Sequence, residues 1–309
     1  MNIYHGVEEL KGQKLSNAVA GLGNFDGIHI GHQELLARVV AHAKRIGGRA
    51  VALTFWPHPR YVLRGLDPRL ITGLEERLKH MERLGIEDVL IFRFNREFSN
   101  QTAEDFVRDT LTRHLDLQAL YVGFNYHFGK GKEGTPESLK ELGEKYHYET
   151  KVVEPVVWKE KTVSSTRVRD AIGMGDLDTT TALLGRNYVL TGPVIKGDQI
   201  GGKVLGYPTA NIHIEHSIAP ASGVYAGWVY GIDGQRYQGA ISIGSNPTFG
   251  EKGLRIEVFI LNFDGDIYGS VLDVEFVKFI RGQQKFESPD ELRMQIGHDI
   301  EEVKDVLTA

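Results

Sequence analysis

Two histidines in a glycine-rich stretch are the first residues whose types and spacing suggest chemistry. His29 and His32 lie three residues apart in GNFDGIHIGH, residues 23–32. Zinc is disfavoured, because two histidines supply only two ligands and the chain has no cysteine and no H-E-x-x-H pattern. Glycines let the backbone approach an anion, a following helix directs N–H groups at it, and imidazoles can donate to phosphoryl oxygens. The histidines alone fit a phosphate site and a plain turn equally well.

The elements around this stretch indicate where it lies in a fold. Apolar, strand-like runs occur at residues 18–22, 49–55, 88–94 and 119–124, with a further extended segment at 151–158. Helical patterns occur at residues 33–45, 74–85, 103–115, 135–146 and 164–175. Strands alternating with helices predict an α/β fold with a parallel sheet and helices on both faces. Ligands bind at the carboxyl ends of such strands, which is where GNFDGIHIGH begins.

The second part of the chain has a different pattern. Strand-like runs follow one another at residues 187–195, 209–214, 223–232, 235–244, 255–263 and 270–280. Helix is expected only at the end, where Ser288 and Glu291 form a capping box before an apolar stripe. This pattern predicts an antiparallel β-barrel with one terminal helix. The boundary is expected within residues 183–188, which gives domains 1–185 and 186–309.

Composition excludes several classes of partner. The net charge is −5, so there is no overall basic surface for nucleic acid. No apolar run approaches the ~20 residues that a membrane span needs, and residues 1–16 lack the regions of a signal peptide. Without cysteine, no disulfide can form. We therefore expect a soluble, cytoplasmic protein with small-molecule partners, no nucleic acid and no membrane; the sequence does not indicate an oligomeric state.

Motifs in the first part resemble a known family. GNFDGIHIGHQ resembles the H-x-G-H signature of nucleotidyltransferases, in the form typical of the adenylyltransferase half of bacterial bifunctional FAD synthetases. TFWPHP (54–59), VGFNYHFGKGKEG (122–134) and SSTRVR (164–169) resemble further motifs of that family, in the same order. The resemblance implies a Rossmann-like nucleotidyltransferase domain in which His29 and His32 stabilise adenylyl transfer.

The same resemblance implies the residues that bind substrates in this domain. ATP and its phosphates are expected at Gly23, Asn24, Phe25, Asp26, Gly31, Ser164, Ser165, Thr166, Arg167 and Arg169. The flavin is expected at Pro57, His58, Phe124, Asn125 and Phe128. The residues alone leave alternatives open, because serines at a helix start are ordinary caps and a histidine between prolines can be structural.

A second set of motifs resembles riboflavin kinases. LGYPTANI (205–212) resembles their P-T-A-N motif, which implies that Thr209 and Asn211 help to hold Mg²⁺ with the ATP phosphates. The preceding GDQIGGKV (197–204) has P-loop spacing, but Val204 stands in place of Ser or Thr and a strand pattern follows, so we reject a P-loop. In this segment Gly202 and Lys203 are expected to contact ATP, although Lys203 stands where the family usually has arginine.

The remaining kinase motifs supply a base. RIEVFILNFDGDIYG (255–269) resembles the family stretch in which Glu257 corresponds to the base, whereas the pattern alone also fits a surface charge on a strand. Phe259 and Asn262 depart from the family pattern. GSNPTFG (244–250) and FIRGQQKFESPDEL (279–292) resemble further kinase motifs, which imply flavin or phosphate contacts for Asn246 and Arg281.

The resemblance implies two reactions in one chain. The barrel would phosphorylate riboflavin with ATP to FMN, and the α/β domain would adenylylate FMN with a second ATP to FAD and pyrophosphate. A ribityl hydroxyl must lose a proton to react, whereas the phosphate of FMN is already anionic, so one base suffices. Alternatives are an inactive domain, another phosphate acceptor for the first domain, or a flavin-binding protein with inactive sites; a nucleic-acid-binding role is weaker still.

Overall fold

The structure is a computed structural model that describes residues 1–196, 206–245 and 254–308. It divides into two compact units, Met1–Ser165 and Thr166–Ala309. Helix α6 (Ser165–Met174) begins at the division, and α7 (Leu177–Leu184) packs on strands of the second unit. The expected domain division at residue 185 differs from this geometric one by two helices and stays a prediction.

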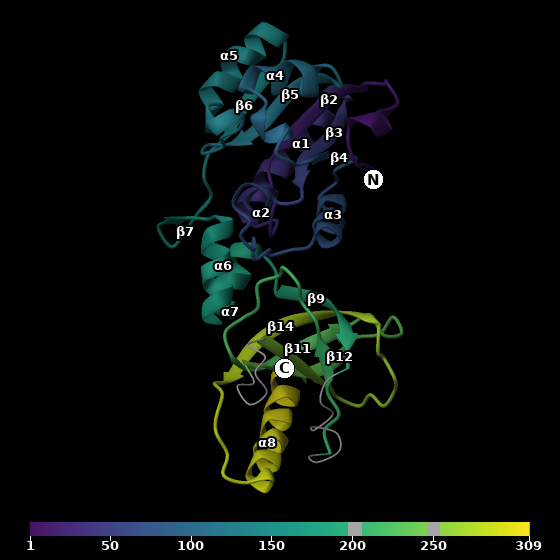
Figure 1. Cartoon of the computed structure of the whole chain (residues 1–309), viewed down its shortest axis with the longest axis vertical. Helices are drawn as coiled ribbons and strands as arrows, with labels where there is room; N and C mark the ends of the chain where they lie inside the picture. The colour runs from purple at the N-terminus through teal and green to yellow at the C-terminus, as the bar shows by residue number, and fades with distance from the viewer. Residues whose placement is uncertain (197–205, 246–253, 309) are drawn as a thin grey trace. The chain divides into compact units, whose positions relative to one another are not determined.

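The first unit is built on a parallel six-stranded sheet with the order β1-β4-β3-β2-β5-β6 (Figure 1). The bounds of its strands are β1 (Asn2–Tyr4), β2 (Leu15–Leu22), β3 (Arg49–Trp56), β4 (Asp88–Arg93), β5 (Leu115–Gly123) and β6 (Glu149–Val153). The four apolar runs of the sequence correspond to the central strands, β2 to β5. The predicted parallel sheet is therefore confirmed.

Alternate residues of the strands enter two separate cores. Val19 of β2 packs with α1 (Ile30–Ile46) and α3 (Leu74–Arg83). Its neighbours Ala18 and Ala20 join a second core that contains residues of the 103–112 segment and of α5 (Pro136–Tyr146). The sheet is thus buried on both faces, as the apolar strands predict. Short helical turns complete the unit at η1 (Val7–Leu10), η2 (Phe98–Asn100) and η4 (Lys130–Lys132).

Local signals position the helices that follow the strands. As expected, Thr135 caps α5 and Pro136 occupies the first turn; Ser138 completes a capping box that was not expected. The sequence analysis missed α2 (Pro59–Arg64), which His58 caps by accepting the N–H of Arg60 at 3.2 Å. Pro59, the second proline after β3, is therefore the first residue of a helix.

The segment 103–115 only partly matches the helix expected there. It contains only a short α4 (Ala103–Asp105), then a π-helix, η3 (Phe106–Thr112), and β5 already begins at Leu115. The wider π-turn brings Phe106, Val107 and Leu111 into the core, and Thr110 is buried with them. A helical segment is thus present where a helix was expected, but most of it is a π-helix and it ends before Leu115.

The second unit contains a closed antiparallel barrel with the order β10-β13-β12-β11-β14-β9. Its strands are β9 (Tyr188–Ile195), β10 (Ala210–Ile212), β11 (Gly223–Tyr230), β12 (Tyr237–Ser245), β13 (Leu254–Ile260) and β14 (Val271–Arg281). Each strand falls within or close to one of the six predicted runs, so the predicted barrel is confirmed. Strand β10 is shorter than expected. Apolar residues at alternate positions, such as Ile256 and Val258, are fully buried.

The terminal helix α8 (Pro289–Thr308) packs on β11, β12 and β14 (Figure 1). Ser288 Oγ accepts the N–H of Glu291 at 3.2 Å, which is half of the predicted capping box. The Glu291 carboxylate accepts the N–H of Glu287 in place of that of Ser288. A small hairpin, β7 (Val157–Trp158) with β8 (Lys161–Thr162), lies between β6 and α6. Within the described ranges, no helix has the length and apolarity to cross a membrane.

Candidate active sites

Three loops meet at one edge of the parallel sheet. The histidine loop follows β2, the segment with Pro57 and His58 follows β3, and Phe124 and Asn125 follow β5. These three strands are adjacent in the sheet, in the order β3-β2-β5. Their carboxyl ends therefore share one edge, and the sequence-predicted ATP and flavin residues of the first unit gather there.

His29 and His32 form one structural pair. His29 is the N-cap of α1, and its Nδ1 accepts the backbone N–H of His32 at 3.2 Å. The two rings stack, with centroids 3.6 Å apart and planes 15° apart. His29 is buried, with 6% of its surface exposed. Because Nδ1 accepts a hydrogen bond, the neutral ring carries its proton on Nε2, which makes Nε2 a donor to an anion at the helix N-terminus.

The glycines of the loop leave room for aromatic rings, and Phe25 packs against the histidine pair. A Cβ added at Gly31 would lie 3.2 Å from the His29 ring, and one added at Gly23 would lie 3.2 Å from the ring of Phe25. Phe25 is fully buried and meets His32 edge-on at 5.4 Å between centroids. Phe25 and Ile28 also have positive φ angles of 50° and 39°. Such strain in a β-branched residue is costly and is typical of functional loops.

Asp26 differs from a phosphate ligand. Its carboxylate is 2% exposed and accepts the backbone N–H groups of Ile71 and Thr72 at 3.1 and 3.2 Å from Oδ1. The buried guanidinium of Arg77 lies 3.5 Å from the same oxygen and donates to the carbonyl of Asn24 at 2.7 Å. A carboxylate used in this way shapes the loop, and an anion beside a phosphate would repel it, so the geometry favours a structural role for Asp26.

Sequence reasoning missed Arg77, and a signal for it exists. It occupies the apolar face of α3 with Leu78 and Met81, and it has no exposed surface. A charged residue on an apolar helix face needs a buried partner, which here is Asp26. Asn24 shows a further feature, because within the described parts of the chain no group donates to its buried Oδ1. That oxygen suits a ligand hydroxyl or amine better than a phosphate oxygen.

The expected flavin residues of the first unit fall into two groups. Phe124 is 41% exposed and Asn125 is exposed, so both are accessible to a ligand. Phe128 is only 8% exposed and packs against Phe106 and Tyr126 in the core. His58 is 7% exposed and caps α2. The structure therefore gives Phe128 and His58 structural contacts, and a stacking role for Phe128 lacks an exposed ring face to support it.

The S-S-T-x-V-R stretch spans the division between the units. Ser165 donates its hydroxyl to the carbonyl of Asp26 at 2.9 Å, which ties the start of α6 to the histidine loop. Ser164 lies one residue before α6, and Thr166, Arg167 and Arg169 belong to α6 on the second-unit side of the division. ATP contacts by these residues stay a prediction.

In the barrel, Asn211 and Glu257 are direct cross-strand partners. Asn211 of β10 lies opposite Glu257 of β13, and Glu257 lies opposite Ser242 of β12. Ile256 and Val258 point into the barrel, so Glu257 and its partners lie on the outer face. Side chains paired in this way have Cβ atoms about 4.5–5.5 Å apart. Two residues far apart in the sequence are thereby brought together, as a shared site requires.

The oxygen donors of this face fit a magnesium ion bound with nucleotide phosphates. Thr209 directly precedes β10 and is two residues from Asn211, so both belong to one face. A hydroxyl, an amide and phosphate oxygens are the hard ligands that Mg²⁺ takes while it keeps several waters. Across residues 1–196, 206–245 and 254–308, no group of three His, Cys, Asp or Glu residues forms a metal cage.

The structure assigns other contacts to the remaining kinase residues. Arg281 makes a two-point ion pair with the buried Asp299 of α8, at 2.8 and 2.6 Å, so its guanidinium serves to hold the helix. Phe259 packs edge-on against Tyr207 beneath α8. Asn262 has a φ of 56°, which asparagine tolerates at a turn. The expected contacts of Gly202, Lys203 and Asn246 lie outside the described residues.

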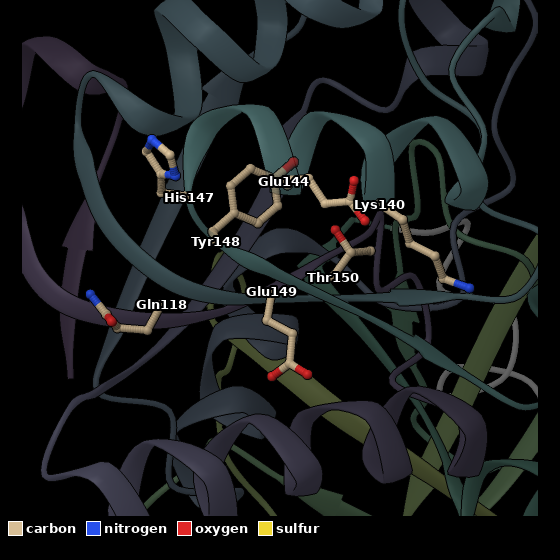
Figure 2. Close-up of a pocket in the computed structure, with 8 residues that line it drawn as sticks. Gln118, Lys140, Glu144, His147, Tyr148, Glu149 and Thr150 are labelled. Atoms are coloured by element: carbon tan, nitrogen blue, oxygen red, sulfur yellow. The ribbon is translucent and has the colours of Figure 1, made fainter.

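One surface depression lies away from these loops. It has a volume of about 500 Å³ and is formed by α5 and the starts of β5 and β6 (Figure 2). The residues that line it are Gln118, Lys140, Gly143, Glu144, His147, Tyr148, Glu149 and Thr150. Glu149 is the first residue of β6, so the depression lies at the amino ends of the strands, opposite the histidine loop. It takes no part in the site described above.

The fold and the two candidate sites are those expected of one class of protein, a two-domain transferase that acts on nucleotide phosphates. Residues 11–167 match the family model of FAD synthetase, and residues 184–307 match that of riboflavin kinase. The chain belongs to the family of bifunctional riboflavin kinase/FMN adenylyltransferases.

Individual relatives agree over nearly the whole chain. The bifunctional riboflavin kinase/FMN adenylyltransferase of Escherichia coli K12 is 33% identical over 300 residues, which cover 97% of this chain and 96% of the relative. That of Bacillus subtilis is 35% identical and covers 94% and 92%. A crystal structure described as a macrolide-efflux protein from Streptococcus pneumoniae is 33% identical, with a TM-score of 0.86 and 98% of both chains covered.

Proposed function

We propose that this chain makes FMN from riboflavin in its second domain and FAD from FMN in its first. The functional domains are residues 1–185 and 186–309, and both reactions take place in the cytoplasm. One observation carries the assignment: the carboxylate of one site lies on an outer face, whereas that of the other is buried in an ion pair. Glu257 stands on the outer barrel face beside Asn211, whereas Asp26, the one carboxylate of GNFDGIHIGH, is buried against Arg77.

That difference matches the two nucleophiles. In the kinase step a ribityl hydroxyl oxygen of riboflavin attacks the γ-phosphorus of ATP, Glu257 takes the hydroxyl proton, and ADP leaves. Thr209 and Asn211 would hold Mg²⁺, which would supply neutralisation of charge on the phosphates. Positioning and charge neutralisation supply most of the rate, because little covalent chemistry is left for the protein.

The adenylyl step needs donors and no base. A phosphate oxygen of FMN attacks the α-phosphorus of a second ATP, the bond to the leaving pyrophosphate breaks, and FAD forms. Charge builds on the oxygens around the α-phosphorus, where Nε2 of His29, the ring of His32 and the N–H groups at the start of α1 stabilise it. The cap that fixes the proton of His29 on Nε2 supports this role.

The test separates the two activities in one sample. Purified protein is incubated with ATP and Mg²⁺ and with either riboflavin or FMN, and the flavins are resolved by chromatography. Glu257→Gln should abolish FMN formation and still convert supplied FMN to FAD; His29→Ala with His32→Ala should do the reverse. Glu301→Gln and His5→Ala, at exposed positions of α8 and the N-terminal segment, are matched controls that should retain both activities.

The outcomes also decide between the alternatives. If neither FMN nor FAD forms, the chain is a flavin-binding protein at most. If FMN forms but is never adenylylated, the first domain is inactive or uses another phosphate acceptor, which nicotinate mononucleotide and phosphopantetheine offered in its place would reveal. Loss of both activities in either folded variant contradicts two independent sites.

A further inference from the structure

A polar row crosses the outer face of the barrel at the level of the kinase base. Asn211, Glu257 and Ser242 are aligned across β10, β13 and β12, while the residues that flank Glu257 and Ser242 in their strands are buried. Asn211 is the neighbour of Glu257 on one side and is assigned to magnesium. Ser242 is its neighbour on the other side, and the proposed reactions give it no role.

The hydroxyl of Ser242 lies near a side chain from the segment that follows β14. Gln283, two residues past β14, donates from Nε2 to the carbonyl of Ile243 at 2.9 Å and lies 3.5 Å from Ser242 Oγ. A Cβ added at Gly244 would lie 3.2 Å from that Nε2, so the glycine leaves room for the amide. The ion pair of Arg281 with Asp299 fixes the chain just before Gln283. The contact is therefore part of an anchored segment.

The direction of this contact determines what the hydroxyl can do. An amide nitrogen only donates, so Ser242 Oγ is the acceptor and its own hydrogen points to a different partner. The residue opposite Ser242 on the adjacent strand is Glu257, and side-chain rotation brings a hydroxyl and a carboxylate together across such a pair, since cross-strand Cβ atoms lie about 4.5–5.5 Å apart. A hydroxyl that donates to a carboxylate holds it in one orientation without taking a proton from it.

We propose that Ser242 is a positioning residue of the kinase site, which donates its hydroxyl to Glu257 and keeps that carboxylate turned toward the flavin hydroxyl, with Gln283 fixing the orientation of Ser242. The proposal rests on the proposed role of Glu257 as the base. It extends the site to β12 and to the segment between β14 and α8. Ser242 does not touch substrate in this scheme, so its loss affects the rate more than binding.

The test compares Ser242→Ala, Ser242→Thr and Gln283→Ala in the full-length protein. For Ser242→Ala we expect the riboflavin kinase kcat to fall about tenfold, with KM for riboflavin and ATP unchanged within about twofold. Ser242→Thr keeps the hydroxyl on a strand that suits a β-branched residue, so it should restore most of the rate. Gln283→Ala should act in the same direction but less, and should add little to Ser242→Ala, because both act through one hydroxyl.

Controls separate this proposal from its foundation. Ser222→Ala, at an exposed serine of the same unit, should keep the kinase rate, and FMN adenylylation should stay unchanged in every variant. Kinase activity retained by Glu257→Gln would overturn the proposed base itself. Loss of activity in Glu257→Gln with a normal rate in Ser242→Ala would overturn the positioning role alone. A defect in Ser242→Ala that raises KM, or that threonine fails to rescue, would also overturn it.

Discussion

Replacing His29 by asparagine separates two tasks that one imidazole performs. The Nδ1 of His29 caps α1 by accepting the N–H of His32 at 3.2 Å, and Nε2 is the proposed donor to the α-phosphate. Asparagine accepts at an N-cap as well as any residue, so His29→Asn should preserve the cap. It removes the ring whose proton the cap fixes on Nε2, and with it the stacking on His32.

The expected magnitudes follow from these contacts. Loss of one preorganised donor to developing charge costs roughly 10²–10³ in kcat, or about 3–4 kcal/mol. The free energy of unfolding should fall in His29→Asn by about 0.5–1.5 kcal/mol, the cost of the lost ring stacking, since the cap survives. His29→Ala loses the cap as well, which costs about 1 kcal/mol and lowers the melting temperature by roughly 2–4 °C in a unit of this size.

The assay follows FAD and pyrophosphate formation from FMN and ATP, beside thermal denaturation of the same samples. Riboflavin phosphorylation is the internal control and should not change. The reasoning fails if His29→Asn adenylylates FMN within a few-fold of the wild-type rate, because the ring would then not be a donor. It also fails if asparagine destabilises the protein as much as alanine does, because the cap would then not be the structural task of His29.

Three other perturbations test neighbouring features. Gly31→Ala places a methyl group 3.2 Å from the His29 ring and should slow adenylyl transfer by about tenfold while kinase activity stays intact in the same assay. Arg77→Met leaves the Asp26 carboxylate buried without its guanidinium, and denaturant titration should show a loss of about 3–5 kcal/mol. Burial raises the pKa of the Tyr225 hydroxyl to about 12 from 10.0, so the folded state holds this proton more tightly than the unfolded state. The free energy of unfolding should therefore fall as pH rises through this range, and less so in Tyr225→Phe, which thermal melts at successive pH values would check.

The sequence pattern predicted correctly those elements whose own residues show how they are buried. The apolar runs of β2 to β5 are buried on both faces, so their composition alone marks them as strands. The segment 103–115 is different, because its helical residues admit an α-helix and a π-helix, and packing against the core selects between them. Helix α2 escaped notice because none of its residues is buried, so it shows no apolar stripe.

The two candidate sites likewise contain features that their own residues show and features that only folding determines. Residue types and motifs identified His29, His32 and Glu257 as candidates, because the chemistry of these side chains follows from their type. Partners set by folding were not visible: the pairing of Asp26 with Arg77 and of Arg281 with Asp299 joins residues from separate elements. Those partners change the interpretation of Asp26 and Arg281 from ligand contacts to structural ones, which no inspection of either motif alone would reveal.

The pairing of Asn211 with Glu257 makes the kinase site depend on the alternation of side chains along the strands. Successive residues of a strand face opposite sides of the sheet. Deleting one residue of β13 next to Glu257 would therefore turn the carboxylate into the apolar interior and expose Ile256 or Val258. Deleting two residues would keep the facing but move Glu257 away from Asn211. Evolution can therefore lengthen or shorten the connections of this barrel, whereas the strands that carry the site admit substitution and almost no change of length.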